Sequence, residues 1–510
     1  MYQNDVKWDN DVLTVRQLID FTAAKYGEKP CIKYADTDDS IIEKSYNQFK
    51  IDSYKAAGII LDRIKERKHI AIIGKTSYQY LAFFNGIFVS GNVAVPLGND
   101  MSPEDALHII KDADVEFVLY DDSFAEKFEK INEKLGTPLQ GINFEKENLD
   151  SYENFAGEIP VADPDDCAII IYTSGTTGDR KGAMLSSRAI ISNVYFEEMS
   201  YEGDHSALNV LPMHHIFCFS CDYLKNLKDG VTLCLNLDVK NVGKNLLRFE
   251  PTVIRLVPMI IESLLRKVRI LRKQNPDLTA REAAEKVFGR KLVSIIASGA
   301  YLSPKVAEEF SEMGIYLRQG YGMTETGPRI SVPNGKTDVD SVGVIISICQ
   351  ARIEGGEIQV KSPSLMMGYY KRDDETEKVF TSDGWFKTGD IGRIGPDRQL
   401  YVTGRLKNVI ILSNGENVSP EEIEKRFVDE PLIKEVMVYG ENDRITAEFY
   451  PDFDWANSNG VHDIAGEIEK IVTGINQTNA TTREIAKIKV RNEPFERNST
   501  GKIIRKQVKF

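Results

Sequence analysis

Short apolar runs alternate with longer segments of helical spacing over most of the chain. Runs rich in Ile, Val and Leu predict buried strands at residues 69–74, 115–120, 167–172, 252–257 and 292–297. Apolar side chains three and four positions apart predict helices at residues 77–90 and 303–313. This alternation is typical of an α/β fold with layered, mostly parallel sheets, whose ligands bind beyond the carboxyl ends of the strands.

The pattern changes past about residue 404. Ser419-Pro-Glu-Glu has the spacing of a capping box and predicts the start of a helix. Shorter strands and a further helix are predicted at residues 436–439, 445–450 and 463–476. We therefore expect a large domain over residues 1–403 and a small α+β domain over residues 404–510.

Length and charge bound the classes of function. A chain of 510 residues is too long for one hydrophobic core, so at least two domains are expected. Lys and Arg number 64 and Asp and Glu number 77, a formal net charge of −13. This acidic balance removes any general attraction to nucleic acid or to an anionic membrane, although local basic patches could still bind phosphate.

No targeting or transmembrane segment is expected. Residues 81–97 form the most apolar stretch, but polar residues, glycines and a proline interrupt it, so a buried helix followed by a buried strand is predicted. The first residues lack the pattern of a signal peptide, and six cysteines are too few for a disulfide framework. These features indicate a cytoplasmic protein.

The charged residues 266–290 mix both signs and predict a solvated helical excursion.

A loop rich in glycine and hydroxyl groups follows the strand predicted at residues 167–172. Its sequence, YTSGTTGDRKG over residues 172–182, offers exposed amides and a lysine, which suit a polyphosphate. It is not a Walker A sequence. An ordinary turn is the alternative, since such residues are common in turns.

Further motifs make the chain recognisable. In order, these are Ser298-Gly-Ala, Gly320-Tyr-Gly-Met-Thr-Glu-Thr, Gly384-Trp-Phe-Lys-Thr-Gly-Asp, Gly404-Arg-Leu-Lys and Asn498-Ser-Thr-Gly-Lys. Together with the loop, they resemble the signatures of the adenylate-forming enzymes, which include acyl-CoA synthetases, firefly-type luciferases and adenylation domains of peptide synthetases. The sequence after Gly404 is most similar to the acyl-CoA synthetase branch, especially its long-chain fatty acyl members.

The resemblance implies a two-step reaction. A carboxylate attacks the α-phosphorus of ATP, with Mg²⁺ as cofactor, to give an acyl-adenylate and pyrophosphate. The thiol of CoA then displaces AMP and forms a thioester. The large domain would bind ATP and the acyl group, and the small domain would act as a mobile lid that carries the catalytic lysine and excludes water.

The resemblance also assigns roles to single residues. Tyr321 offers a ring for adenine, and its alternative is a core aromatic residue. Glu325 is a hard oxygen ligand for Mg²⁺, and Thr324 could donate to the α-phosphate; otherwise this pair would begin a helix. Asp390 could accept hydrogen bonds from the ribose, or simply form a turn. Lys502 would stabilise the charge that builds up between the carboxylate and the α-phosphate; its alternative is a solvated lysine in a basic tail.

The expected site residues fall into four groups. Catalytic roles are expected for Lys502, Thr324, Glu325 and His215. The ATP site is expected to contain Thr173, Ser174, Gly175, Thr176, Thr177, Gly178, Lys181, Ser298, Gly299, Ala300, Gly320, Tyr321, Gly322, Asp390 and Arg405. Lys407 is expected to be the interdomain hinge, and Thr176 and Glu325 the contacts to the metal.

A segment rich in His and Cys has a metal site as an alternative interpretation. His214, His215, Cys218 and Cys221 include a Cys-x-x-Cys spacing that zinc could use. The bulky apolar residues around them instead resemble the wall of the family's acyl pocket, beside the substrate carboxylate.

The sequence motifs indicate that ATP is bound, but they do not identify the acid substrate as closely. Met213, His215, Phe217 and Met259 predict an apolar tunnel, which favours a fatty acid, and medium-chain or aromatic acids stay open. An acyl carrier protein could replace CoA as the acceptor. A nucleotide-binding module without catalysis is the alternative of another class.

Overall fold

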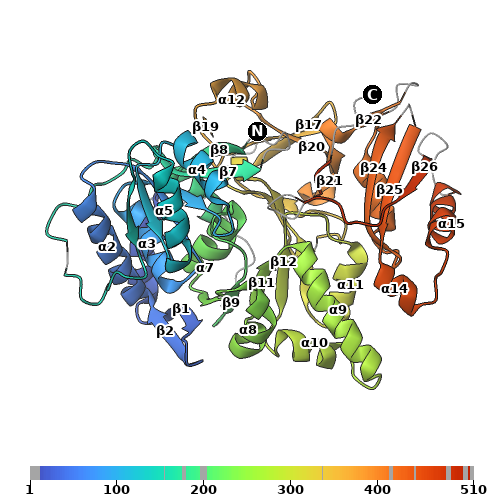
Figure 1. The fold of residues 1–510 in the computed structure, drawn as a ribbon, viewed down its shortest axis with the longest axis horizontal. Helices are drawn as coiled ribbons and strands as arrows, with labels where there is room; N and C mark the ends of the chain where they lie inside the picture. Colours follow the sequence, from blue (N-terminus) through green and yellow to red (C-terminus); the bar gives the residue numbers. More distant parts are fainter. Residues whose placement is uncertain are drawn as a thin grey trace.

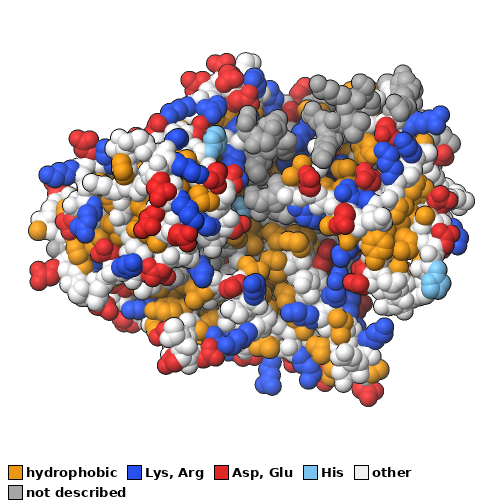
Figure 2. Space-filling model, in the orientation of Figure 1, with side chains coloured by type: hydrophobic (Ala, Val, Ile, Leu, Met, Phe, Trp, Pro, Cys, Tyr) orange, Lys and Arg blue, Asp and Glu red, His pale blue; other side chains and the backbone are white. Residues whose placement is uncertain are grey.

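The computed structural model describes residues 12–153, 155–174, 180–195, 204–335, 337–412, 417–441, 444–477, 484–497 and 503–505. Among these residues, no helix is both long enough and apolar enough to cross a bilayer. All six cysteines are free thiols. Basic and acidic side chains are interspersed over the face shown in Figure 2, so this face shows no large patch of one sign.

Two seven-stranded sheets form the large part of the molecule (Figure 1). The first has the order β19-β8-β7-β4-β3-β5-β6 and is parallel from β6 to β7. Its strands are β3 (His69–Ile73), β4 (Val93–Leu97), β5 (Phe117–Tyr120), β6 (Gln140–Asn143), β7 (Cys167–Ser174), β8 (Arg180–Ser186) and β19 (Gly368–Tyr369). The antiparallel pair β7 and β8 encloses the glycine-rich loop, which therefore lies at the carboxyl end of a central strand.

The second sheet has the order β13-β12-β11-β9-β10-β1-β2 and is parallel from β13 to β1. Its strands are β1 (Pro30–Ala35), β2 (Ile41–Ser45), β9 (Ser206–Asn209), β10 (Thr232–Leu235), β11 (Val253–Leu256), β12 (Ser294–Ala297) and β13 (Tyr316–Gln319). The predicted buried strands are thus confirmed, with ends that differ by at most two residues.

Helices pack on both sheets. They are α1 (Val15–Tyr26), α2 (Tyr46–Arg63), α3 (Tyr78–Val89), α4 (Pro103–Asp112), α5 (Ala125–Glu133), α6 (Ser187–Tyr195), α7 (Lys225–Asp229), α8 (Val242–Phe249), α9 (Pro258–Gln274), α10 (Ala280–Phe288), α11 (Pro304–Glu312) and α12 (Asp373–Val379). The excursion at residues 266–290 is helical as expected, but it is not wholly solvated. One face of α9 and one face of α10 lie in an apolar cluster with Leu265 and Phe288, both fully buried.

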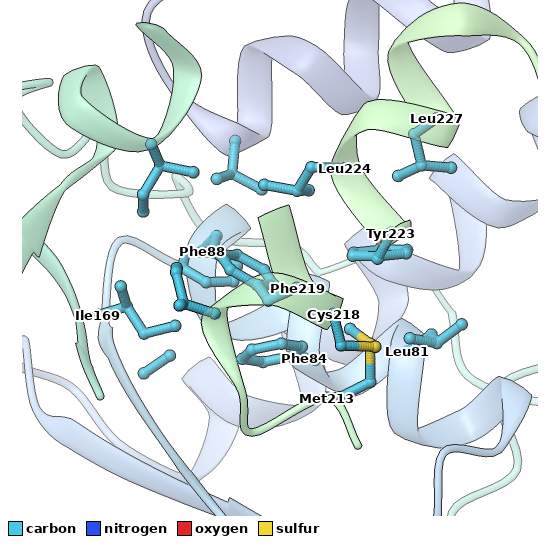
Figure 3. Packing of buried hydrophobic residues seen from close by; sticks show 14 of the residues in the cluster. Leu81, Phe84, Phe88, Ile169, Met213, Cys218, Phe219, Tyr223, Leu224 and Leu227 are labelled. Atoms are coloured by element: carbon cyan, nitrogen blue, oxygen red, sulfur yellow. The ribbon is translucent and has the colours of Figure 1, made fainter. Parts of the chain in front are cut away.

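The main core surrounds α3, whose residues are buried on almost every face. Phe84, Phe88 and Phe219 contact one another there, and the rings of Phe88 and Phe219 are stacked with centroids 5.6 Å apart (Figure 3). Phe219 belongs to a π-helical segment, Phe217–Leu224, that runs into α7. The most apolar stretch of the sequence is therefore a buried helix that leads into the buried strand β4, as predicted.

Two smaller sheets complete the large part. One contains β14 (Tyr321–Gly322), β15 (Arg329–Val332) and β16 (Val344–Ile345). The other contains β17 (Gln350–Glu354), β18 (Glu357–Lys361), β20 (Phe386–Ile394) and β21 (Leu400–Arg405). A domain boundary at residue 404 stays a prediction, and β21 itself continues through Arg405.

The C-terminal elements lie beside β21 and helix α11 and have an apolar core of their own (Figure 1). They are β22 (Ile410–Ile411), β23 (Asn417–Val418), α13 (Pro420–Glu424), β24 (Ile433–Glu441), β25 (Arg444–Pro451), α14 (Phe453–Ser458), α15 (Ile464–Gln477) and β26 (Ile485–Val490). Helix α13 begins where predicted, but the expected capping box is wrong. Ser419 Oγ donates to the carbonyl of Thr403, 3.0 Å away, and makes no capping hydrogen bond.

Candidate active site

The glycine-rich loop is described at its two ends. Thr173 lies opposite Lys181 in the β7–β8 ladder. Gly175, Thr176, Thr177 and Gly178, and the side chain of Ser174, lie outside the described residues. The ladder places Lys181 at the mouth of the loop, where its ammonium group forms an ion pair with Glu375 of α12.

A tyrosine joins Lys181 to the predicted metal ligand. The Lys181 ammonium lies 5.2 Å from the centroid of the Tyr369 ring. The hydroxyl of Tyr369 donates to Glu325 Oε1 at 2.9 Å, and both residues are buried. Burial and the charge of Glu325 raise the pKa of Tyr369, so its hydroxyl stays protonated and can donate.

The turn that carries Thr324 and Glu325 is a 3₁₀ segment, Thr324–Thr326. A side chain at Gly322 is impossible without rearrangement, since an added Cβ would lie 1.8 Å from the carbonyl oxygen of Pro328. Asn193 of α6 holds the strand that leaves the turn. Its amide donates to the carbonyl of Arg329 at 3.1 Å and its oxygen accepts from the Arg329 N–H at 3.2 Å.

Tyr321, Asp390 and Arg405 form one cluster. Asp390 and Arg405 are opposite each other on β20 and β21. Arg405 Nε lies 2.7 Å from Asp390 Oδ1, and the Tyr321 hydroxyl donates to Asp390 Oδ2 at 2.5 Å. Burial and the nearby carboxylate raise the pKa of Tyr321. The structure thus brings together three residues from three separate motifs, of which Tyr321 lies 69 positions before Asp390.

Lys407, the expected hinge, follows this cluster in a short 3₁₀ turn, Leu406–Asn408. Partial desolvation and the charges of Arg405 and Arg505 lower the pKa of Lys407 to about 8. Lys502 lies outside the described residues.

The strand ends of the second sheet bring the remaining motif residues together. Ser298, Gly299 and Ala300 follow β12, and Gly320 follows its parallel neighbour β13. The N–H of Gly320 donates to the carbonyl of Ala297 at 2.9 Å, and Gln319 Nε2 donates to that of Ala300 at 2.6 Å. Parallel strands end at the same sheet edge, so these loops lie beside the Tyr321 turn, as expected.

The histidines precede the π-helical segment. The rings of His214 and His215 have centroids 4.1 Å apart, and burial lowers the pKa of both, so both are neutral near pH 7. Their neighbour Met213 is buried and Phe217 is half-buried, but Met259, expected in the same wall, is 58% exposed at the start of α9.

The nearby cysteines make other contacts. Cys218 Sγ lies 2.9 Å from the carbonyl oxygen of Leu211, and Cys221 Sγ lies 3.1 Å from Arg329 Nε. Within the described ranges, no group of three or more His, Cys, Asp or Glu is arranged to hold a metal ion.

Tyr369, Glu375 and Asn193 escaped the sequence analysis. Each lies outside the motifs, and its partner is between 44 and 194 positions away along the chain. Nothing in the sequence indicated which residue the Tyr369 hydroxyl contacts.

Known proteins resemble this chain over most of its length. It is 28% identical to malonate–CoA ligase of Arabidopsis thaliana, over 86% of this chain and 77% of the relative. It is 25% identical to long-chain-fatty-acid–CoA ligase 5 of Rattus norvegicus, over 85% and 74%. The structure of o-succinylbenzoate–CoA synthetase from Bacillus subtilis with its acyl-adenylate intermediate has a TM-score of 0.78, 25% identity, and coverage of 97% of this chain and 98% of that one.

The family models confirm the resemblance inferred from the motifs. The model of the AMP-binding enzyme matches residues 19–370, and the model of the AMP-binding enzyme C-terminal domain matches residues 407–509. The first match alone covers more than half of the 510 residues. The chain therefore belongs to the AMP-binding enzyme family.

Proposed function

We propose that the protein is an AMP-forming acid–thiol ligase that converts a carboxylic acid to an acyl-adenylate with ATP and transfers the acyl group to CoA. The observation that carries the proposal is the convergence of two clusters on one short segment. The Tyr321 hydroxyl contacts Asp390, which pairs with Arg405. Four residues after Tyr321, Glu325 contacts Tyr369, whose ring lies under the Lys181 ammonium. The first cluster suits a nucleoside, and the second suits a metal-bound polyphosphate.

Glu325 suits Mg²⁺. Its carboxylate is buried, and Oε1 accepts a hydrogen bond from Tyr369. Across the described parts of the chain, no donor hydrogen-bonds Oε2, which leaves this oxygen for a cation. Thr176, the other expected metal contact, lies in the part of the loop that is not described. When bound, Mg²⁺ would neutralise phosphate charge and polarise the phosphoryl group.

The residues of the chain would then act in distinct ways. Asp390 would accept hydrogen bonds from the ribose, and Arg405, which contacts Asp390, would hold its carboxylate in place. Thr324 and Lys181 would bind phosphate oxygens. Lys502 would stabilise the charge that develops between the acid and the α-phosphate, so a variant without this ammonium should bind ATP but fail to adenylate.

A fatty acid is the substrate that we propose. Buried Met213 and half-buried Phe217 offer apolar contact, and the neutral rings of His214 and His215 bring no positive charge for a second carboxylate. This argument favours an apolar monocarboxylic acid over a dicarboxylic acid such as malonate, the substrate in the name of one relative. Loading of a carrier protein is the alternative acceptor reaction.

An acid panel tests the proposal. Acid-dependent exchange of pyrophosphate into ATP is expected with fatty acids and not with malonate or succinylbenzoate. Exchange with a dicarboxylate alone would overturn the proposed acid class, and no exchange with any acid would favour the nucleotide-binding module. CoA and a holo-carrier protein, compared as acceptors, separate the two thioester reactions.

Lys502→Ala tests the assignment of the catalytic lysine. We expect exchange to fall by at least about a hundredfold, because one placed charge is lost from the transition state, while ATP binding measured by calorimetry persists. Lys509→Ala, in the same basic tail, is the matched control. Unchanged exchange in Lys502→Ala would contradict the assignment.

A further inference from the structure

Tyr369 occupies a position between two groups that the proposed reaction needs. It lies on β19, which pairs with β8 so that Tyr369 is opposite Ala183, two residues after Lys181. On the other side, the N–H of Met366 donates to the carbonyl of Glu325 at 2.9 Å. The short segment from Met366 to Tyr369 therefore joins the backbone of the Glu325 turn to the strand that carries Lys181.

The side chain of Tyr369 makes a second connection between the same two groups. Its hydroxyl contacts Glu325 Oε1, and its ring face lies beneath the Lys181 ammonium. A buried carboxylate with a single hydrogen-bond donor can rotate about its side-chain torsions once that donor is removed. A cation over an aromatic face is likewise attracted by the electron-rich ring.

The surroundings hold the tyrosine in one orientation. Its own N–H donates to Thr376 Oγ1 at 2.9 Å, and its side chain is only 6% exposed. A tyrosine whose backbone and ring are both fixed loses little further freedom when its hydroxyl binds a carboxylate. The arrangement is therefore prepared before any ligand arrives.

We propose that Tyr369 is a positioning residue, whose hydroxyl orients the Glu325 carboxylate toward the metal and whose ring keeps the Lys181 ammonium beside it. This inference rests on the proposed function, which places Mg²⁺ at Glu325 and phosphate at Lys181. Tyr369 itself touches neither substrate. It acts through the two residues that do.

The test compares two neighbouring tyrosines. Tyr369→Phe removes the hydroxyl and keeps the ring, so the contact to Glu325 is lost while the platform for Lys181 remains. Tyr370→Phe is the matched control, because its hydroxyl donates to Asp114, at 2.8 Å, away from the site. Mn²⁺ binding in the presence of α,β-methylene-ATP, an analogue that cannot transfer its AMP group because its α–β link is not cleaved, is measured by calorimetry and by the electron spin resonance of free Mn²⁺.

We expect Tyr369→Phe to weaken Mn²⁺ binding by about tenfold, the usual effect of losing a hydrogen bond to a charged group. Affinity for the analogue at saturating Mn²⁺ should change by less than about threefold, and the melting temperature should stay close to that of the parent. Tyr369→Leu, which also loses the ring, should weaken binding of the analogue as well. Tyr370→Phe should match the parent in both measurements.

A double-mutant comparison excludes a merely structural role. In a Glu325→Gln background, Tyr369→Phe should cause no further loss of Mn²⁺ affinity, because the two residues act through one contact. Unchanged Mn²⁺ affinity in Tyr369→Phe, or an equal loss in both backgrounds, would overturn the proposal. Binding of Mn²⁺ and of the analogue is measured without turnover, so these measurements test the role of Tyr369 alone. Pyrophosphate exchange by the parent tests the proposed function, so a failure of one can be told from a failure of the other.

Discussion

Lys181 is held by a carboxylate at the place where we propose that phosphate binds. Glu375 pairs with Lys181 and also with Lys378, at 2.6 Å on the same helix. These two ammonium groups lower the pKa of Glu375 to about 2, so it stays ionised at any pH at which the protein would be assayed. A phosphate group that binds Lys181 must therefore compete with Glu375.

Replacement of Glu375 tests this competition. In Glu375→Gln, Lys181 loses its charged partner, so we expect the dissociation constant of α,β-methylene-ATP to fall by up to about fivefold, a size typical of exposed ion pairs. Calorimetry measures it. Asp374→Asn is the control, because Asp374 pairs with Lys378 and has no contact with Lys181. Weaker binding in Glu375→Gln would mean that the carboxylate orients Lys181 for the nucleotide and does not compete with it.

Among the elements, the pattern of apolar positions predicted the strands that are buried along most of their length. The strands β3, β7 and β12 are buried on both faces and appear in the sequence as continuous apolar runs. The π-helical segment Phe217–Leu224 was not predicted, because it is buried on almost every side, polar residues included, and so shows no helical period of apolar positions. The capping box at Ser419 failed for another reason: a tertiary acceptor, the carbonyl of Thr403, binds the serine hydroxyl.

In the candidate site, too, some features could be predicted from the sequence and others could not. Motif residues such as Tyr321, Asp390 and Arg405 could be named from the sequence because each lies in a short signature. Their shared hydrogen bonds could not, since these depend on how β20 and β21 are placed against β14. Side chains that reach across elements, such as Asn193, carry no local signal at all.

Helix α13 carries a carboxylate with an altered pKa. Glu424 pairs with Arg505 and accepts from the N–H of Val438 at 2.6 Å. Desolvation exceeds the attraction of Arg505 and raises the pKa of Glu424 to about 7. Since Arg505 also donates to the carbonyl of Val438 at 3.0 Å, this pair holds the segment just after residue 502 against β24.

The altered pKa predicts a dependence of stability on pH. A pKa raised on folding stabilises the folded state fully below the unfolded value, 4.5, and this contribution is lost as the pH rises through about 7. Glu424→Gln cannot ionise, so its free energy of unfolding should fall less between pH 4.5 and 8, by up to about 3 kcal/mol. Urea denaturation at several pH values measures this. Glu421→Gln, whose carboxylate lies 3.9 Å from Arg505, should keep the slope of the parent. Equal slopes in all three proteins would contradict the prediction.

At the scale of the whole molecule, one carboxylate of the C-terminal part contacts the start of α11. The Ser303 hydroxyl donates to Asp429 Oδ1 at 2.9 Å, and Lys305 Nζ lies 3.2 Å from Oδ2. A negative charge at a helix N-terminus is also stabilised by the helix dipole. Nearby, the ammonium of Lys425 lies 4.7 Å from the centroid of the Tyr301 ring. These contacts hold the C-terminal part in the orientation shown in Figure 1.

If the C-terminal part is a lid that docks one way for adenylation and rotates for thioester formation, Asp429 biases it toward the docked orientation. Asp429→Asn removes the charge that both Lys305 and the helix dipole favour. Exchange of pyrophosphate should therefore slow by about fivefold if the described orientation serves adenylation, while thioester formation from added acyl-adenylate should be unchanged or faster. Asp454→Asn, at an exposed position of α14, is the matched control. Small-angle scattering measures the orientation of the C-terminal part independently of turnover. If Asp429→Asn has the scattering profile and the half-reaction rates of the parent, Asp429 does not set the position of the lid.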